Sequence, residues 1–351
     1  MDKIININDY KIGKNEPVFI IAEVGVNHNG DLELAKKLIK EAARCGADCV
    51  KFQTFNAEKL VLQDAPKANY QLQTTPNDES QLQMLKKLEM NIDKYSEIIR
   101  CCENEGVLFI STPYNIEDVD FLEDLGVAAF KLASMHAAEP WFARYVAKKN
   151  KPIFLSTGMS TLSEIDTTVR SIKETGNDKL ILLQCTTNYP SKIEDTNLLA
   201  MNTMSKTFNL MAGYSDHTED DTACIESVAL GAKVIEKHFT LDKSLPGPDH
   251  TTSATPIEFI NLVKNIRNTE KSLGSSVKQP CEIEKINMKG MRRSIVAKND
   301  IDKGVKITDD MIALKRPSSG ISPMYLDEII GKKTSNKVFK DQILKWHDIE
   351  E

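Results

Sequence analysis

Blocks of apolar residues alternate with amphipathic segments along roughly the first 270 residues of the chain. The apolar blocks lack the in-and-out alternation of a half-exposed sheet, which is typical of parallel strands buried on both faces. Helical periodicity marks the segments between them, among them Asp31–Cys45, Ser80–Glu105, Ser163–Glu174 and Ile257–Leu273. Eight strands alternating with helices predict a (β/α)8 barrel. The predicted strands are Val18–Glu23, Cys49–Phe55, Leu108–Pro113, Ala129–Ser134, Ile153–Thr157, Leu180–Tyr189, Leu210–His217 and Lys233–Leu241.

Each predicted strand ends in residues with polar side chains. In (β/α)8 barrels the chemistry belongs to the carboxyl ends of the strands, and buried charges are costly unless they are paired or used. An open, doubly wound sheet would instead gather such residues mainly at one crevice. The distribution therefore favours a barrel with an active site at this rim. The residues concerned are Glu23, Lys51, Gln53, Thr112, Lys131, Ser134, Ser156, Thr187, Tyr189, Ser215, His217, Glu236 and His238.

The pattern changes after Gly274. Residues 275–290 are polar, contain Pro280 and show no clean periodicity, which is typical of a linker. Short strand-like runs and turns follow to the end of the chain. We therefore expect a barrel over residues 1–274, a linker over 275–290 and a small β-rich domain over 291–351.

Composition narrows the class of protein. A net charge of −6 argues against nucleic acid or an anionic membrane as a partner, because both require a cationic surface. The amino-terminal residues lack a signal-peptide layout and no apolar run reaches transmembrane length, so we expect a cytoplasmic protein. The seven cysteines are scattered without metal-ligand spacing, which favours reduced thiols.

Two histidines occupy matched strand ends. His217 lies two residues after Ser215, and His238 lies two after Glu236, so each pair points to one side of its strand. A lone histidine is usually a core or surface residue, but two at neighbouring strand ends can reach one divalent ion. Nitrogen ligands near oxygen groups suit Mn, Co, Fe or Zn. Water or substrate would complete the shell, giving a Lewis acid able to polarise a carbonyl group.

Lys51 and Lys131 are the cationic residues at the predicted rim. With the hydroxyl groups around them they predict a pocket for the phosphate and carboxylate of one small molecule. Alternatively, each lysine only pairs with a neighbouring carboxylate. A third hypothesis is an aldolase that forms a Schiff base on one lysine. The histidine pair argues against this because a metal would already activate the carbonyl group.

Glu23, Glu236 and Asp249 are candidate acid–base or sugar-binding groups. Asp249 belongs to the loop Gly247–His250 after the last predicted strand, although Pro-Asp pairs also make simple turns. Arg316, fixed before a proline in the second domain, could reach into a neighbouring active site. Taken alone, it would be a solvated surface charge.

Several long motifs in order resemble those of the bacterial sialic acid synthases. These nonulosonic acid synthases condense phosphoenolpyruvate with an N-acetylated mannosamine-type sugar, and the last sixty or so residues are similar to their antifreeze-like (SAF) domain. The alternative is a non-catalytic sugar-binding homologue, against which the retained histidines, lysines and Arg316 speak. The motifs are Ile21–Gly30, Val50–Phe55, Ser156–Met159, Gly213–His217, Glu236–Leu241, Gly247–His250 and Lys315–Pro317.

The resemblance implies a role for each of these residues. His217 and His238 would hold the metal, usually Mn²⁺, with Co²⁺ or Mg²⁺ as alternatives. Gln53 would orient a water near it, and Glu23 or Glu236 would manage a proton or stabilise a cationic centre. Phosphoenolpyruvate would contact Lys51, Thr112, Lys131, Ser134, Ser156, Thr187 and Ser215. The sugar would contact Glu23, Tyr189, Asp249 and Arg316, the last supplied by the partner subunit of a domain-swapped homodimer.

Two segments depart from the family pattern. Met135–Glu139 replaces a Gly-Glu continuation after Ser134, and Thr251–Thr255 replaces an Ala-Ser-Leu/Ile run. We expect both to affect the choice of sugar. The candidates are N-acetylmannosamine, giving N-acetylneuraminate, and 2,4-diacetamido-2,4,6-trideoxymannose, giving a legionaminate. An altrose-derived precursor of pseudaminate fits the overall resemblance less well.

Overall fold

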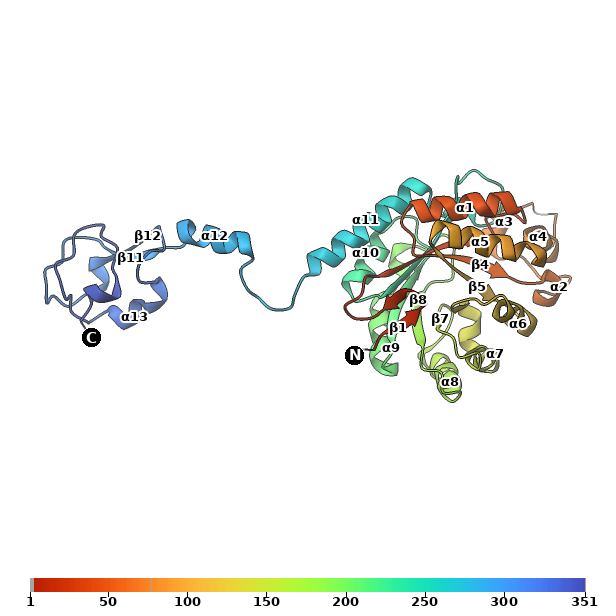
Figure 1. Cartoon of the computed structure of the whole chain (residues 1–351), viewed down its shortest axis with the longest axis horizontal. Helices are drawn as coiled ribbons and strands as arrows, with labels where there is room; N and C mark the ends of the chain where they lie inside the picture. Colours follow the sequence, from red (N-terminus) through yellow and green to blue (C-terminus); the bar gives the residue numbers. More distant parts are fainter. Residues whose placement is uncertain (1–2, 77, 351) are drawn as a thin grey trace. The chain divides into compact units, whose positions relative to one another are not determined.

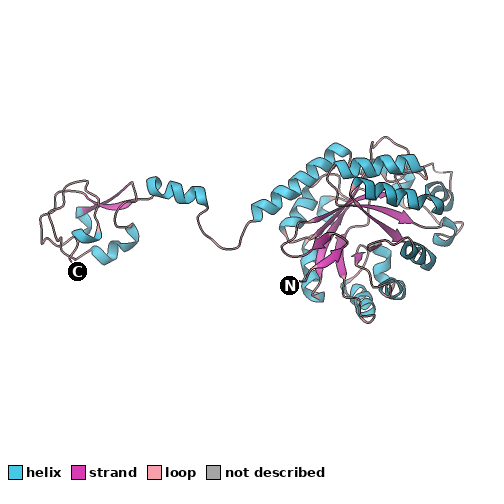
Figure 2. Cartoon of the chain, viewed as in Figure 1, coloured by secondary structure: helices cyan, strands magenta, loops and turns pink. Residues whose placement is uncertain are grey.

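The computed structural model describes residues 3–76 and 78–350, which form two compact units, Met1–Gly274 and Ser275–Glu351 (Figure 1). In the first unit, eight parallel strands close into a barrel in the order β10-β3-β4-β5-β6-β7-β8-β9 (Figure 2). The predicted (β/α)8 barrel is therefore confirmed. Its strands are β3 Phe19–Gly25, β4 Cys49–Thr54, β5 Leu108–Pro113, β6 Phe130–Leu132, β7 Ile153–Ser156, β8 Leu180–Cys185, β9 Met211–Asp216 and β10 Val234–His238.

Helices form the layer outside the strands (Figure 1). The prediction of one helix over Ser80–Glu105 is wrong, because the structure has two helices there with a break between them. At the break, the Asn91 side chain accepts from the Asp93 N–H at 2.9 Å and begins a new helical turn. The helices are α1 Leu32–Arg44, α2 Ala57–Leu60, α3 Asn69–Thr74, α4 Gln81–Leu88, α5 Tyr95–Glu105, α6 Ile116–Asp124, α7 Pro140–Ala147, α8 Leu162–Lys173, α9 Leu199–Phe208, α10 Thr222–Ala229 and α11 Pro256–Leu273.

A short hairpin, β1 (Ile5–Ile7) and β2 (Tyr10–Ile12), precedes the barrel and is absent from the predicted elements. Its buried isoleucines pack into one cluster with interior barrel residues such as Phe19 and Phe154. Burial of each isoleucine contributes about 1.5–3 kcal/mol. Because Phe19 and Ile153–Phe154 open their strands, the hairpin covers the amino-terminal end of the barrel.

Residues 57–88, here called the β4–α5 excursion, contain α2, α3 and α4. Lys67 is buried within it and donates to Thr75 Oγ1 at 2.9 Å and to the Pro76 carbonyl at 2.7 Å. Its ammonium group also lies 3.2 Å from Glu79 Oε1. At the base of the excursion, the Glu89 carboxylate accepts from the Ala57 N–H. These contacts give a segment without sheet pairing a defined shape.

The second unit has its own apolar core, which includes Ile295, Ile307 and Leu344. Its strands β11 (Ser294–Ala297) and β12 (Ile312–Lys315) pair antiparallel, and α13 spans Leu326–Ile329. Residues 275–290 differ from the expected irregular linker, because α12 occupies Glu282–Met291. The Glu284 carboxylate accepts from the Cys281 N–H at 2.9 Å and so caps this helix.

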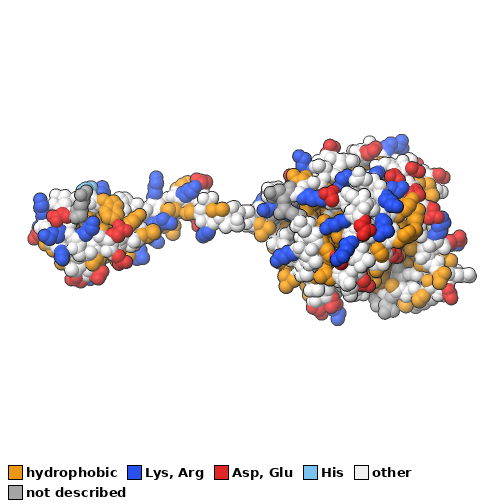
Figure 3. All heavy atoms as spheres, turned by 90° about the horizontal axis from the view of Figure 1, so that it is seen from below, with side chains coloured by type: hydrophobic (Ala, Val, Ile, Leu, Met, Phe, Trp, Pro, Cys, Tyr) orange, Lys and Arg blue, Asp and Glu red, His pale blue; other side chains and the backbone are white. Residues whose placement is uncertain are grey.

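Basic and acidic side chains are interspersed over the face seen in Figure 3. Across residues 3–76 and 78–350, no helix has the length and apolar character that crossing a membrane requires.

Candidate active site

The carboxyl ends of the barrel strands bring two lysines and two glutamates together. In the strand register, Glu23 pairs with Lys51, and Ser215 pairs with Glu236. The Lys51 ammonium group lies 2.8 Å from Glu23 Oε1 and 3.7 Å from Glu236 Oε1, and that of Lys131 lies 3.5 Å from the same Glu236 oxygen. Lys51 and Lys131 are only 4% and 2% exposed. The strand-end rule thus correctly grouped these residues.

Hydroxyl groups surround the charges. Lys51 donates to Thr112 Oγ1 at 3.3 Å, Lys131 donates to Ser156 Oγ at 2.7 Å, and Ser215 donates to Glu236 Oε1 at 2.9 Å. The second oxygens of Glu23 and Glu236 are buried and find no hydrogen-bond partner among the described residues. Buried carboxylate oxygens without a partner are costly, and a purely structural ion pair would have no reason to keep them. We therefore infer that this cluster binds a ligand.

The two carboxyl groups have different proton affinities. Burial raises the pKa of Glu23 to about 7, assisted by Glu236 and only partly opposed by Lys51. Burial would also raise the pKa of Glu236, but Lys131 and Lys51 together hold it below its ordinary value. Burial lowers the pKa of Lys131, whereas the two carboxylates keep the pKa of Lys51 above its ordinary value despite burial. Because the pKa values of the two glutamates shift in opposite directions, Glu23 is suited to act as an acid, whereas Glu236 stays ionised.

The histidine rings lie beside this cluster. The ring centroids of His217 and His238 are 5.4 Å apart, and the Tyr189 ring lies 4.1 Å and 5.5 Å from them. The Nδ1 of His217 is 2.7 Å from the Thr186 carbonyl oxygen, so Nδ1 donates and Nε2 is left to accept or ligate. Burial, together with the charge of His217, lowers the pKa of His238, which keeps this ring neutral as a ligand must be.

The donor set fits a divalent metal held by two imidazoles. The buried Nδ1 of His238 has no hydrogen-bond partner in the described chain, and it lies 3.8 Å from Asp249 Oδ2. No three histidine, cysteine, aspartate or glutamate side chains gather as a metal-binding group within residues 3–76 and 78–350. Any ion bound here would therefore take its remaining ligands from water or substrate.

A buried ion pair lies behind the histidines. Asp216 and Lys237 alternate with the site residues along β9 and β10, so their side chains point to the opposite face of the sheet. The Lys237 ammonium group lies 2.5 Å from Asp216 Oδ2 and donates to the carbonyl groups of Thr218 and Asp220 at 2.7 and 2.6 Å. Asp216 Oδ1 accepts from the Thr218 N–H at 2.9 Å. The network ties the loop after His217 to β10.

Four predicted residues lie outside the strands that were expected to carry them. β6 ends at Leu132, β8 at Cys185 and β9 at Asp216, so Ser134, Thr187, Tyr189 and His217 lie just beyond the ends of their strands. The ladder between β8 and β9 stops at the Cys185–Ser215 pair. Ser134 Oγ accepts from the Gly158 N–H at 3.1 Å. A Cβ atom on Gly158 would lie 2.4 Å from Thr187 Oγ1, so a glycine is needed where these hydroxyls meet.

A cavity of about 350 Å³ opens beside His238. Gln53, Tyr189, His238 and Asp249 are among the residues that line it from the barrel, and the β4–α5 excursion lines another side. Gln53 Nε2 donates to Glu23 Oε1 at 3.1 Å, and the Tyr114 hydroxyl donates to Gln53 Oε1 at 3.2 Å. Burial raises the pKa of Asp249 to about 6. The cavity thus brings His238, predicted to hold the metal, together with Tyr189 and Asp249, two of the residues predicted to contact the sugar.

Two tyrosines of this cavity are missing from the sequence prediction. Tyr114 directly follows Pro113, the last residue of β5, so the strand-end rule could have found it. Tyr70 lies in the excursion, and its ring centroid is 4.8 Å from that of Tyr189. Its neighbours in sequence give no periodic signal that would have marked it.

The loop that carries Asp249 is held from the barrel side. Asn27 Nδ2 donates to the Phe239 carbonyl and to Ser253 Oγ, both at 2.9 Å. Ser253 Oγ in turn donates to the Asp249 carbonyl at 2.6 Å. Arg316 is exposed in the second unit, directly after β12, and its contact with a sugar stays a prediction.

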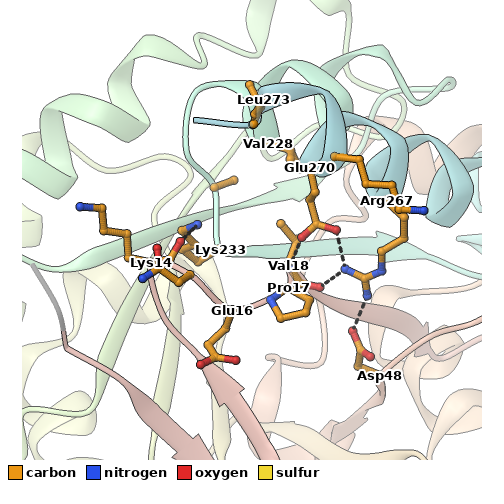
Figure 4. Close-up of a pocket in the computed structure, with 14 residues that line it drawn as sticks. Lys14, Glu16, Pro17, Val18, Asp48, Val228, Lys233, Arg267, Glu270 and Leu273 are labelled. Atoms are coloured by element: carbon orange, nitrogen blue, oxygen red, sulfur yellow. Dashed lines mark hydrogen bonds and ion pairs between the residues drawn. The ribbon is translucent and has the colours of Figure 1, made fainter. Parts of the chain in front are cut away.

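A larger cavity of about 790 Å³ lies where the barrel strands begin (Figure 4). In Figure 4, Arg267 reaches between Glu270 and Asp48, at 3.1 and 3.3 Å. It also donates to the Val18 carbonyl at 2.8 Å, and Asp48 accepts from the Ile20 N–H at 2.8 Å. These ion pairs and hydrogen bonds hold α11 against the start of β3, so we assign this group of charges a structural role.

Comparisons with known proteins show which family the chain belongs to. The NeuB family model matches residues 38–278, and the SAF domain model matches residues 292–350. The chain is 44% identical to the N,N'-diacetyllegionaminic acid synthase of Campylobacter jejuni, covering 93% of this chain and 98% of that protein. It is 42% identical to the enzyme of the same name from Legionella pneumophila, covering 96% of each.

A solved structure gives the same result. The N-acetylneuraminic acid (sialic acid) synthetase of Leptospira borgpetersenii superposes with a TM-score of 0.73 and 33% identity, over 82% of this chain and 96% of that one. The predicted resemblance to sialic acid synthases is confirmed. The chain therefore belongs to the NeuB family, is an enzyme of the synthase type, and carries a SAF domain at its carboxyl end.

Proposed function

We propose that this enzyme condenses phosphoenolpyruvate with an N-acetylated mannosamine-type sugar and releases a nonulosonic acid and phosphate. The observation that carries the proposal is the buried Lys51–Lys131 cluster beside the His217–His238 pair. An anion-binding group and a carbonyl-binding group at one strand-end rim are what joining these two reactants requires.

The lysines are suited to a small, multiply charged anion. The phosphate and carboxylate of phosphoenolpyruvate would take over the ammonium groups that now contact Glu23 and Glu236, with hydroxyl donors at Thr112, Ser156 and Ser215. An anion beside Lys131 would offset the burial that lowers its pKa and keep it protonated. Ser134 and Thr187, which converge at Gly158, would add further hydroxyl contacts.

His217 and His238 would hold the divalent ion, such as Mn²⁺, Co²⁺ or Mg²⁺, which when bound would polarise the aldehyde oxygen of the open-chain sugar. Asp249 and Tyr189 line the cavity where the sugar hydroxyls would lie. Gln53, which is hydrogen-bonded to both Glu23 and Tyr114, would hold a water at the edge of the charge cluster.

The bond changes balance with one water. C3 of phosphoenolpyruvate bonds to C1 of the sugar, which leaves positive charge at C2. Water adds to C2, and the C2–O bond then breaks to release phosphate and leave a ketone. The two protons of the water end on the new hydroxyl group and on phosphate.

The two glutamates would have different roles. Glu236, held ionised by two lysines, would stabilise the positive charge at C2. Glu23, with a pKa of about 7, would donate a proton to the oxygen at C1. Sequence alone left these two roles open between Glu23 and Glu236.

The test is phosphate release from phosphoenolpyruvate with Mn²⁺, using N-acetylmannosamine and 2,4-diacetamido-2,4,6-trideoxymannose separately. Release that requires a sugar and yields a nine-carbon 2-keto acid supports the proposal. Lysine trapping by borohydride with pyruvate would instead indicate the Schiff-base aldolase. Sugar binding by calorimetry, without release or trapping, would indicate a non-catalytic homologue.

A further inference from the structure

One wall of the 350 Å³ cavity is apolar. It consists of Leu60 from α2 and of Met84, Leu85 and Leu88 from α4, here called the apolar wall. Met84 and Leu88 belong to a buried cluster, while Leu60 and Leu85 are half-buried against it. His238, Gln53 and Asp249 line the same cavity from the barrel. The cavity is therefore polar at the strand ends, and at the excursion it has this apolar wall with Gln71 and Gln81 beside it.

The helix geometry directs this wall at the cavity. Gln81, Met84, Leu85 and Leu88 have the spacing of one helix face, and all four line the cavity. The opposite face carries exposed residues such as Lys86. Lys67 and Glu89 fix the excursion through the contacts described above, so the wall is preformed.

The orientation of the sugar follows from the chemistry. This step rests on the proposed function, in which the aldehyde carbon lies beside His238. The other end of the sugar then extends away from the strand ends toward the apolar wall. A hydroxyl group there would face leucine and methionine side chains and lose its water, whereas a methyl group would bury apolar area.

We propose that the apolar wall is a specificity subsite for methyl groups of the sugar, and that it selects a 6-deoxy sugar with two acetamido groups over N-acetylmannosamine. Met135, from a segment that departs from the family pattern, lines the same cavity and is 39% exposed. Its flexible side chain suits contact with an acetamido methyl group.

The experiment compares kcat/KM for 2,4-diacetamido-2,4,6-trideoxymannose and N-acetylmannosamine at saturating phosphoenolpyruvate and Mn²⁺. We expect the full-length enzyme to prefer the diacetamido sugar by roughly 10- to 200-fold, as placing methyl groups in an apolar pocket allows. Leu85→Gln should lower this ratio at least about ten-fold without changing KM for phosphoenolpyruvate. Leu60→Asn, on a different helix, should lower it in the same direction.

Leu82→Gln is the matched control. Leu82 lies on α4 and packs against the same hydrophobic cluster, but it does not line the cavity. It should leave the ratio unchanged. A wild-type preference for N-acetylmannosamine, or unchanged ratios in folded Leu85→Gln and Leu60→Asn, would overturn the subsite and leave the synthase intact. Absence of phosphate release with both sugars would overturn the proposed function and the subsite together.

Discussion

Replacing Lys237 by methionine should destabilise the barrel far more than loss of a surface ion pair. Lys237 is 4% exposed and Asp216 1% exposed, and the lysine serves three acceptors: the Asp216 carboxylate and the Thr218 and Asp220 carbonyl groups. Methionine matches the length of the lysine stem but leaves a buried carboxylate without its cation. Removing one partner of a buried pair costs about 3–5 kcal/mol.

The control is Lys243→Met. Lys243 pairs with Glu258 at 2.7 Å, but the two side chains are 37% and 46% exposed. An exposed pair of this kind contributes about 0–1 kcal/mol. A double variant, Lys237→Met with Asp216→Asn, removes the orphaned charge while an amide oxygen can still accept from the Thr218 N–H. It should recover at least about 1 kcal/mol of the loss.

Urea unfolding followed by far-ultraviolet circular dichroism measures these differences, because α1–α11 belong to the barrel. With m about 1–3 kcal/mol/M, Lys237→Met should lower the midpoint by about 1 M or more, and Lys243→Met by a few tenths. Equal midpoints for these two single variants would refute the reasoning. A double variant no more stable than Lys237→Met would show that the cost does not come from the unpaired charge.

Three further results are expected. Chelation should abolish phosphate release, and added Mn²⁺ should restore it. His217→Ala should lower the bound manganese, measured by elemental analysis, without lowering the urea midpoint. Full turnover without metal would contradict the histidine site. Lys131→Met should raise KM for phosphoenolpyruvate about 10- to 100-fold, because a charge-assisted contact is lost, whereas Lys149→Met, a surface pair with Asp120, should not. Arg316→Ala should raise KM for the sugar and leave KM for phosphoenolpyruvate unchanged, whereas the control variant Arg293→Ala should change neither. An unchanged KM for the sugar, or a monomer detected by light scattering, would contradict the domain-swapped homodimer.

Much of the barrel could be predicted because its signals are local. Each buried strand is a continuous apolar run, and a polar residue at its carboxyl end identifies the rim, as Lys51 and His238 do. The extent of β8 could not be predicted, because it depends on where pairing with β9 stops, at Cys185 and Ser215. The hairpin strands Ile5–Ile7 and Tyr10–Ile12 are too short for any periodicity to appear.

The shape of the excursion could not be predicted from the sequence, for a different reason. Its shape depends on side-chain hydrogen bonds such as those from Lys67 to Thr75 and to the Pro76 carbonyl, which no hydrophobic pattern encodes. Tyr70 and Leu85 reach the cavity only because of that shape. The same holds for Tyr189, which lies beyond the end of β8 yet has its ring centroid 4.1 Å from that of His217.

The anchoring of the excursion has a consequence for how such an enzyme can be altered. Lys67 and Lys87 both pair with Glu79, and Lys67 also donates to the Pro76 carbonyl, so this part of the segment is held by contacts among its own residues. The groups proposed for bond formation lie instead on the barrel strands or, for His217, directly after one. The proposed apolar wall and the groups proposed for bond formation thus belong to separate stretches of the chain. A graft of residues 57–88 from a relative could exchange the sugar while the chemistry stays in place.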